Sequence, residues 1–554
     1  MNIMEILEPL IIHLPALVIA VPLLAAFLTP LISRINDKLR NAFAIIMLSI
    51  NAFFVFLLSY DVFTNGTRVY VFGADTQQTL AAIQQGVPMV RILFEIDGLS
   101  AFMAIVAAIL PLAAVFYAWG FMKEHTGLDK FYTLILLMST GMLGMVLTGD
   151  MFNFFVFLEI TSISSAALVA FYTNKGPSVL AGFKYIVIST IGALFVLFAV
   201  ALLYGQYNAL NIAVLANNIQ FGFIDKIALI LLVVALAMKS GVVPMHMWLP
   251  DAYGRAPAAV TLVLIGTTQA SLYGLFRVCF TLYGNQLKSA MKTIEMFGNT
   301  IQMNISSLVG VFLIALAIVT ILIGVLMALK QNDFKRMIGY AAVAEIGYML
   351  LAFGAALSTL VEDPVSKIPL LSVHGDMALK GSLFHIINDA LDVGLMFLVA
   401  GAVYYATKET SLNKLGGLAR NMKYTSIFFI IALLAVSGMP PMNGFASKLL
   451  IYESTYAINP ILAIVAILCS ILLLAVFVKV FHSVFLGPKM KKFENVKEVP
   501  KSMLIGMGII AFFIIFFGLF PDLIVTNIIQ PAVNAMMNLS GEGGYISTIL
   551  GGGL

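Results

Sequence analysis

Several ionisable residues lie inside the long apolar runs of this sequence, at positions that would be deep in a membrane. The lysines of this set are Lys184, Lys239, Lys380, Lys448 and Lys479. The other members are Glu159, Glu345, Asp389, Asp392 and His385. A charge at the centre of a membrane helix costs about 2.5–3.5 kcal/mol on insertion scales, so such groups usually have a function. The alternative is that some form structural ion pairs or, like Lys479 near a polar loop, reach the interface.

Glu159 and Lys239 are the strongest candidates for proton chemistry, because both lie near the middle of an apolar run. A poorly hydrated environment disfavours the charged form of a lysine, and a nearby carboxylate restores that charge. A glutamate–lysine pair on neighbouring helices therefore binds or releases a proton when the distance between the two groups changes. Several such pairs in a row would form a relay through the middle of the membrane.

Proline residues predict a break in two of the helices that carry these lysines. Pro244 follows Lys239, and Pro440-Pro441 precedes Lys448. The carbonyl groups that lose their helical donors are those of Ser240, Val436 and Ser437. Such groups are tolerated at membrane depth only inside protein or beside a wet cavity, and paired broken helices indicate a midplane ion site. Proline kinks also occur in membrane helices without a site.

A third group of polar residues follows one face of a helix. His385, Asp389 and Asp392 are spaced i, i+4 and i+7, and Asn388 borders that face. The stripe suits a hydrated proton path or the oxygen ligands of a cation. It would equally suit structural pairing with lysines of adjacent helices, and the two interpretations remain open.

The elements that must position these residues are membrane helices. The 554 residues are 61% hydrophobic and 10% charged, whereas soluble proteins are about 25% charged. This composition excludes a soluble enzyme, a nucleic-acid binder and a disulfide scaffold. Apolar runs of about 20 residues predict an all-α polytopic membrane protein with about fourteen spans. The predicted spans are 10–33, 41–60, 98–119, 131–149, 151–172, 180–204, 224–243, 258–283, 305–328, 338–357, 376–406, 424–457, 459–486 and 503–520. Two of them, 376–406 and 424–457, exceed one crossing, and we expect both to contain breaks.

Loop charges predict the orientation of the chain. Basic residues are concentrated in alternate loops, most densely in 487–502. The positive-inside rule therefore places that loop in the cytoplasm and both termini outside a cell membrane. Cys279 and Cys469 have no cysteine neighbour, and the sequence has no nucleotide-binding motif, so we expect no cofactor in this chain.

Five motifs resemble the antiporter-like subunits of Mrp-type sodium/proton antiporters, respiratory complex I, membrane-bound hydrogenases and related ferredoxin-driven complexes. The motifs are GDMFNFFVFLEI (149–160), AMKSGVVPMHMWLPDAYGRAP (237–257), KRMIGYAAVAEIGYMLL (335–351), HIINDAL (385–391) and SGMPPMNGFASK (437–448). The resemblance implies a fourteen-helix fold in which helices 4–8 and 9–13 are inverted repeats and helices 7 and 12 are broken. The implied regions are 1–130 (three helices and an outer loop), 131–283 (first repeat), 305–486 (second repeat) and 487–554 (last helix and tail).

The resemblance also implies roles for individual residues. In the first half-channel, ion translocation would involve Glu159, Lys184, Lys239 and His246. In the second it would involve Glu345, His385, Asp389, Asp392 and Lys448. Gln269 would be the central link, where many members have a lysine. Glu345 replaces a frequent histidine or glutamine, Asp389 a frequent histidine, and Asp392 a frequent lysine. These changes add carboxylates, which favour sodium in the second half, and leave an unbroken central proton relay in question.

Three functions remain open from the sequence. The first is an ion-translocating subunit, for H⁺, Na⁺ or both, of an Mrp-type antiporter or a redox complex such as a membrane-bound hydrogenase. Its partners would be other membrane subunits and, in a redox complex, peripheral redox subunits. The residues of the GDMFNFFVFLEI motif favour the D-type component of Mrp antiporters and its relatives. The alternatives are a self-contained secondary transporter of a small solute and a structural subunit whose membrane charges no longer have a function.

Overall fold

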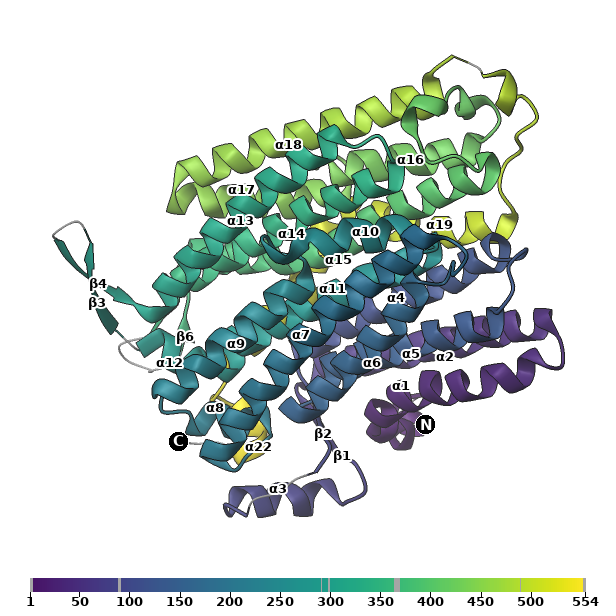
Figure 1. Cartoon of the computed structure of the whole chain (residues 1–554). Coiled ribbons are helices and arrows are strands. Elements are labelled where there is room, and N and C mark those ends of the chain that lie inside the picture. Colours follow the sequence, from purple (N-terminus) through teal and green to yellow (C-terminus); the bar gives the residue numbers. More distant parts are fainter. Residues whose placement is uncertain are drawn as a thin grey trace.

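The computed structural model describes residues 3–87, 91–289, 291–296, 299–362, 369–488 and 490–551. Most of them form long helices that pack side by side with similar axis directions (Figure 1). In the described part of the chain, thirteen helical segments are long and apolar enough to cross a membrane. The prediction of an all-α polytopic membrane protein is therefore confirmed.

The first half of the chain supplies nine of the larger helices and a π-helical extension. They are α1 (Ile3–Ser33), α2 (Asp37–Asn65), α4 (Gly98–Phe121), α5 (Leu128–Leu147), α6 (Met151–Val169), α7 (Gly176–Tyr207), α9 (Phe223–Ser240), α10 (Trp248–Arg255), α11 (Ala258–Phe276) and η2 (Arg277–Leu282). Acidic side chains cap several helix starts. For example, Asp97 accepts from the Ser100 amide at the start of α4, and Asp150 accepts from the Asn153 amide at the start of α6.

The second half supplies seven more. They are α13 (Ile305–Lys330), α14 (Phe334–Ser358), α15 (Val373–Thr407), α16 (Lys423–Val436), α17 (Asn443–Ile458), α18 (Pro460–Val480) and α19 (Lys501–Leu519). The apolar stretches of α11 and α15 are entirely buried, so these helices lie at the centre of the bundle, whereas α7, α13 and α18 have broad outward faces. The predicted spans thus correspond to thirteen apolar segments and the divided pair α16–α17.

Short elements occur at the opposite end of the bundle from the basic loops. The two-stranded antiparallel sheets are β1 (Arg68–Val71) with β2 (Leu93–Ile96), β3 (Met291–Met296) with β4 (Asn299–Asn304), and β5 (Val361–Glu362) with β6 (Pro369–Leu370). The short helices include α3 (Thr76–Gln84), α8 (Ile212–Asn218), α12 (Gly284–Ser289), α20 (Pro521–Ile524), α21 (Gln530–Met537) and α22 (Tyr545–Leu550).

Of the two predicted breaks within long spans, one is confirmed and one is wrong. The 424–457 segment divides between α16 and α17, at the Pro440-Pro441 pair. The 376–406 segment lies within α15, which is unbroken over 35 residues and spans about 52 Å at 1.5 Å per residue. The prediction relied on length alone. Because α15 contains no proline, it continues as one helix that is longer than the hydrocarbon core is thick.

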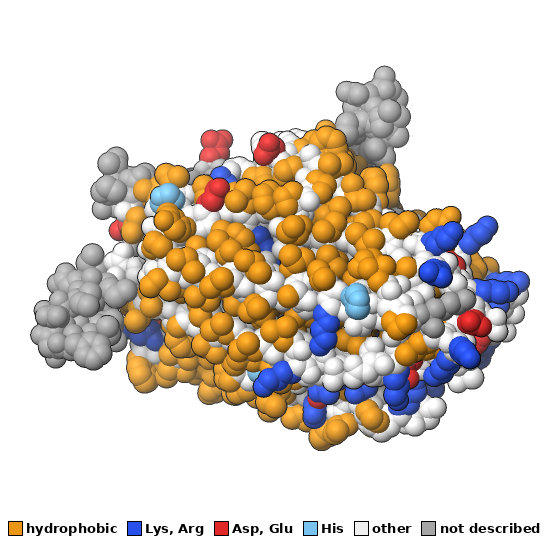
Figure 2. Space-filling model, turned by 90° about the horizontal axis from the view of Figure 1, so that it is seen from above, with side chains coloured by type: hydrophobic (Ala, Val, Ile, Leu, Met, Phe, Trp, Pro, Cys, Tyr) orange, Lys and Arg blue, Asp and Glu red, His pale blue; other side chains and the backbone are white. Residues whose placement is uncertain are grey.

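Surface chemistry agrees with a membrane setting. Figure 2 shows hydrophobic side chains over the middle of one face, while lysine and arginine side chains gather at one end of the helices. Exposed large apolar residues on this outer surface include Phe183, Leu194, Phe198, Phe312 and Leu468. A water-exposed protein rarely has so extensive an apolar surface, because it would associate or aggregate. The outer faces of the bundle therefore contact lipid or other membrane subunits.

Candidate functional site

The first candidate site lies at the break after α9. Gly241 ends this helix with a φ of 84°, a left-handed conformation that glycine adopts without a steric cost. The carbonyl of Met238 accepts a hydrogen bond from the Trp248 indole at 3.1 Å, and the amide of Val243 donates to the Thr320 hydroxyl at 3.2 Å. Side chains from other segments thus satisfy backbone groups that the helix break releases.

Lys239 lies in the last turn of α9 and is 8% exposed. Its Nζ donates to the hydroxyl of Ser162 on α6 at 2.6 Å. Glu159 lies one turn earlier on α6, is half-buried, and its Oε1 has no hydrogen-bond partner among the described residues. The structure therefore places the two predicted groups on facing helices, with Ser162 rather than Glu159 holding the ammonium group. The sequence analysis missed Ser162, although its i+3 spacing from Glu159 places both on one helix face.

Lys184 and His246 lie apart from the Lys239 contact. Lys184 on α7 is exposed, and its Nζ is 2.7 Å from Asp251 Oδ2 on α10. Asp251 Oδ1 also contacts the Arg336 guanidinium of α14 at 3.1 Å. His246 is half-buried in the 3₁₀ turn Met245–Met247. No described hydrogen bond or ion pair joins Lys184 to Glu159 or Lys239. Sequence analysis did not identify Asp251 or Arg336, and no spacing signal marks them.

The second candidate site lies at the break between α16 and α17. Lys448 on α17 is 1% exposed, and its Nζ is 2.9 Å from Glu345 Oε1 on α14. The same ammonium group donates to the carbonyl of Val436 at 2.7 Å. The carbonyl of Ser437 accepts from the Ser470 hydroxyl at 3.2 Å. Both carbonyls are ones that the two prolines release, so the helix break supplies an acceptor directly to the buried lysine.

His385 completes a buried triad at this site. Its Nε2 is 2.8 Å from Glu345 Oε2, and its Nδ1 is 3.0 Å from the Ser447 hydroxyl. The Lys448 ammonium also lies 4.6 Å from the centre of the Tyr348 ring, where the face of the ring attracts a cation. Glu345 therefore bridges a lysine and a histidine at a buried position.

The stripe on α15 continues from His385 to the contact with α11. Gln269 is fully buried on α11, and its Nε2 donates to Asp389 Oδ2 at 2.6 Å. The Oδ1 atoms of Asp389 and Asp392 have no hydrogen-bond partner among the described residues. Asn388 exchanges hydrogen bonds with Asn443 at the start of α17, both at 3.0 Å. Polar contacts therefore extend from the second break to the centre of the bundle.

The two remaining lysines in the apolar runs are peripheral. Lys380 pairs with Asp376 one turn earlier on α15, at 2.6 Å. Lys479 is exposed near the end of α18, which is compatible with a position at the interface.

The segment that carries these residues matches a known family of membrane subunits. A family model described as NADH:quinone oxidoreductase/Mrp antiporter, TM, matches residues 148–362 and 368–474, which is more than half of the chain. The chain belongs to this family. A second model, described as NADH-Ubiquinone oxidoreductase (complex I), chain 5 N-terminus, matches residues 88–132.

Individual relatives agree with this assignment over most of the chain. NADH-quinone oxidoreductase subunit N of Desulforudis audaxviator is 30% identical over 546 residues, which cover 94% of this chain and 98% of the relative. The D component of the Na(+)/H(+) antiporter of Alkalihalophilus pseudofirmus is 30% identical over 436 residues, which cover 78% of each. Among solved structures, a chain of the membrane-bound sulfane sulfur reductase, an archaeal respiratory membrane complex, has a TM-score of 0.79 at 26% identity. The match covers 97% of this chain and 99% of that chain.

The two sites of this Mrp/NADH:quinone oxidoreductase family member differ in how their charges are paired. In the second site, Glu345 contacts both Lys448 and His385 directly. In the first, Lys239 is bonded to a neutral hydroxyl, and Glu159 makes no ion pair within 4 Å in the described part of the chain. A buried charge without a counter-charge is costly. A change of protonation would therefore relieve a larger cost of uncompensated charge in the first site than in the second.

Proposed function

We propose that this chain is the antiporter-like, ion-translocating membrane subunit of a multisubunit complex. The observation that carries the proposal is the contact of Glu345 with Lys448 and His385 beside a broken helix. A lysine and a histidine around one carboxylate form an element whose proton occupancy depends on distance. The matching arrangement of Glu159 and Lys239 at the other break would supply a second such element.

The mechanism that we infer is switching between paired and separated states. When a carboxylate holds its lysine, the ammonium form is stabilised; when the two separate, the lysine releases a proton to its surroundings. The described conformation combines a closed pair, Glu345 with Lys448, and an open pair, Glu159 with Lys239. Opposite states at the two breaks are what alternating uptake and release would require. Gln269 and Asp389 would lie on the route between them.

Sodium is the second candidate ion, and it would bind in the α15 stripe. Asp389 and Asp392 each present a carboxylate oxygen that has no described hydrogen-bond partner. Hard cations such as Na⁺ prefer oxygen ligands. Gln269 would then hold Asp389 in position rather than pass a proton.

The host would be an Mrp-type antiporter or a redox-driven respiratory complex in the cell membrane. The relatives and the solved structure belong by name to a sodium/proton antiporter, a quinone oxidoreductase and a sulfane sulfur reductase. In each case the chain would sit among other membrane subunits, and its apolar outer faces supply the surface for them. The basic end of the helices would face the cytoplasm, with both termini outside.

The proposal is tested by ion transport in the native complex. Glu159→Ala and Lys239→Ala should each abolish proton transport into liposomes that contain the reconstituted complex, while subunit assembly stays intact. Lys479→Ala is the matched control, because this exposed lysine makes no described ion pair. Full transport in either of the first two variants contradicts the first site. A purified single chain that transports by itself would instead support a self-contained transporter.

A further inference from the structure

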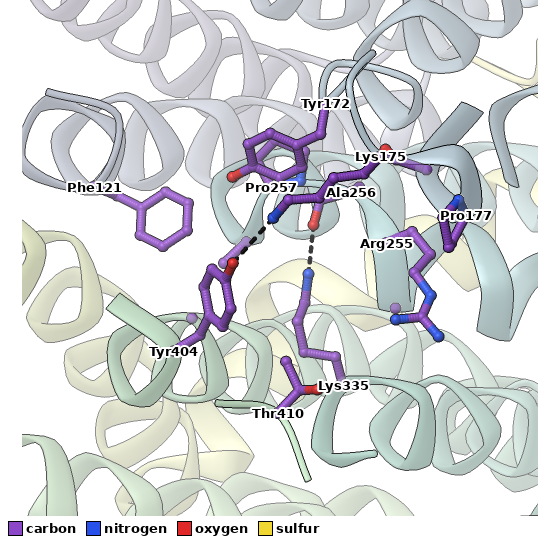
Figure 3. A pocket seen from close by; sticks show the side chains of 14 residues that line it. Phe121, Tyr172, Lys175, Pro177, Arg255, Ala256, Pro257, Lys335, Tyr404 and Thr410 are labelled. Atoms are coloured by element: carbon purple, nitrogen blue, oxygen red, sulfur yellow. Dashed lines mark hydrogen bonds between the residues drawn. The ribbon is translucent and has the colours of Figure 1, made fainter. Parts of the chain in front are cut away.

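A cavity of about 350 Å³ opens at the basic end of the helices, away from both helix breaks. It lies where the α6–α7 turn, the α10–α11 junction and the starts or ends of α14 and α15 meet (Figure 3). Its volume is in the range of small-molecule sites. Segments from both halves of the family match line it, so any occupant would contact both halves.

Three cationic side chains enter this cavity. Lys335 forms the buried floor and donates to the backbone carbonyl of Ala256, which is a neutral acceptor. Lys175 at the exposed mouth donates to the Tyr404 hydroxyl at 3.0 Å and lies 4.6 Å from the centre of the Tyr172 ring. Figure 3 shows both lysines directed into the same space. Neither lysine has a carboxylate within 4 Å in the described part of the chain.

Arg255 is the third cation, and of the three it alone has a described carboxylate partner within 4 Å. Its guanidinium is 3.5 Å from Asp333 Oδ2. Asp333 is already engaged, because it caps α14 through the Arg336 amide and accepts from the Thr410 hydroxyl. The three cations therefore exceed the nearby negative charge. A buried ammonium group with neutral partners is costly unless an anion approaches it.

We propose that this cavity binds a phosphate-bearing anion, either the head group of an acidic phospholipid or a soluble phosphate ester. Lysine and arginine make charge-assisted hydrogen bonds to phosphate oxygens. The Tyr404 hydroxyl adds a further polar group, and apolar walls from Phe121, Pro177 and Pro257 suit the carbon part of such a molecule. Basic pockets between membrane helices at the cytoplasmic side are typical places for acidic head groups.

The position of the cavity gives the bound anion a structural role. Lys335 is ten residues before Glu345 on α14, which is about 15 Å along the helix axis. Arg255 ends α10, the short helix that follows the break next to Lys239. An anion held by Lys335 and Arg255 together would therefore fix α10 against α14, the two helices that lead to the two candidate sites.

The test measures binding to the full chain in nanodiscs. Native mass spectrometry of the chain released from nanodiscs with equal amounts of phosphatidylglycerol and phosphatidylcholine should show phosphatidylglycerol retained in preference to phosphatidylcholine. Lys335→Gln and Lys175→Gln should each weaken phosphatidylglycerol binding at least tenfold, which corresponds to about 1.4 kcal/mol. If Lys335→Gln fails to fold, Lys175→Gln remains informative, because Lys175 is exposed. Lys479→Gln, an exposed lysine outside the cavity, should leave binding unchanged.

Competition identifies the source of the phosphate. Displacement of phosphatidylglycerol by glycerol 3-phosphate or inorganic phosphate supports a soluble phosphate ester. Retention of the lipid in their presence supports a membrane head group. Equal binding of phosphatidylcholine, unchanged binding in the folded cavity variants, or an equal loss in Lys479→Gln would overturn the proposal.

Discussion

At the scale of single residues, the same pair of side-chain types behaves differently at the two breaks. Glu345 contacts Lys448 at 2.9 Å and His385 at 2.8 Å, and all three are buried. Glu159 is only half-buried and makes no ion pair within 4 Å in the described part of the chain. Truncating one partner of a buried pair leaves the other charge uncompensated, so the two glutamates should differ in their effect on stability.

Glu345→Gln should destabilise the protein strongly. The substitution removes the charge that compensates Lys448 and leaves Lys448 with the Val436 carbonyl as its main acceptor. Breaking a buried pair in this way costs about 3–5 kcal/mol. The loss should appear as a clear fall in the apparent Tm of the purified complex.

Glu159→Gln is the matched comparison for that measurement. It should remove transport while lowering the apparent Tm much less, because Glu159 makes no ion pair that is lost. Equal destabilisation by the two variants would show that Glu159 is paired as tightly as Glu345, contrary to the described geometry.

The carboxylates of α15 lead to a prediction about ion choice. Asp389→Asn together with Asp392→Asn removes the two charges that could hold a cation. If sodium binds there, activity measured against sodium concentration should lose its dependence or shift it at least tenfold, because hard cations bind carboxylate oxygen best. An unchanged sodium dependence would leave Asp389 as a structural partner of Gln269.

At the scale of elements, the sequence predicted breaks where proline removes a backbone donor, and it failed where it relied on length. Pro440-Pro441 frees the carbonyls of Val436 and Ser437, and the structure finds Lys448 and Ser470 bonded to them. In contrast, α15 has no proline and continues without a break. At the second break local chemistry was therefore sufficient to predict which carbonyls become available, but length was not sufficient to predict helix continuity.

The side-chain contacts between helices could not be predicted from the sequence. The positions of Glu159 and Lys239 in apolar runs were predictable, but the partner of Lys239 depends on the relative rotation of α6 and α9. The hydroxyl of Ser162 took that place. Likewise, Lys184 pairs with Asp251 across α7 and α10, and nothing in their spacing indicates this. Such pairings are set by packing over long sequence separations.

The start of α6 gives a prediction about pH. Asp150 caps this helix by accepting from the Asn153 amide at 2.7 Å, and burial raises its pKa from 3.8 to about 6 despite that hydrogen bond. Between these values the folded state holds a proton that the unfolded state has lost, so this contribution to stability falls as the pH rises through the window. Asp150→Asn keeps a capping oxygen and removes the charge.

We expect the difference in apparent Tm between Asp150→Asn and the parent to grow with pH. Near pH 4 the variant and the parent should have similar apparent Tm values, and above about pH 6 the variant should be more stable by roughly 1–3 kcal/mol. Asp75→Asn is the control, because Asp75 caps α3 at an exposed position. A gap between Asp150→Asn and the parent that is equal at both pH values would contradict the linkage.

At the scale of the whole molecule, a polar contact joins the two most buried helices, one from each half of the chain. The central helices α11 and α15 have entirely buried apolar stretches, so polar groups there have no access to bulk water. Gln269 on α11 and Asp389 on α15 make the contact between them at 2.6 Å. His385 of the second site lies one turn before Asp389 on the same face of α15. The hydrogen bond between Gln269 and Asp389 therefore links the two halves of the chain. It lies at a position where solvent would least affect the protonation of Asp389.

Gln269→Leu tests whether transport needs this link. The substitution leaves Asp389 without its described donor but does not touch the Glu345–Lys448 pair or the Lys239–Ser162 contact. If ions or their conformational signal pass between the halves here, transport by the reconstituted complex should fall at least tenfold. Gln269→Lys should restore much of it, because an ammonium group can donate to Asp389 as the amide does. Ser271→Ala is the control on the same helix, since the one hydrogen bond described for this hydroxyl is to the Thr267 carbonyl. Full activity in Gln269→Leu would mean that each half works independently.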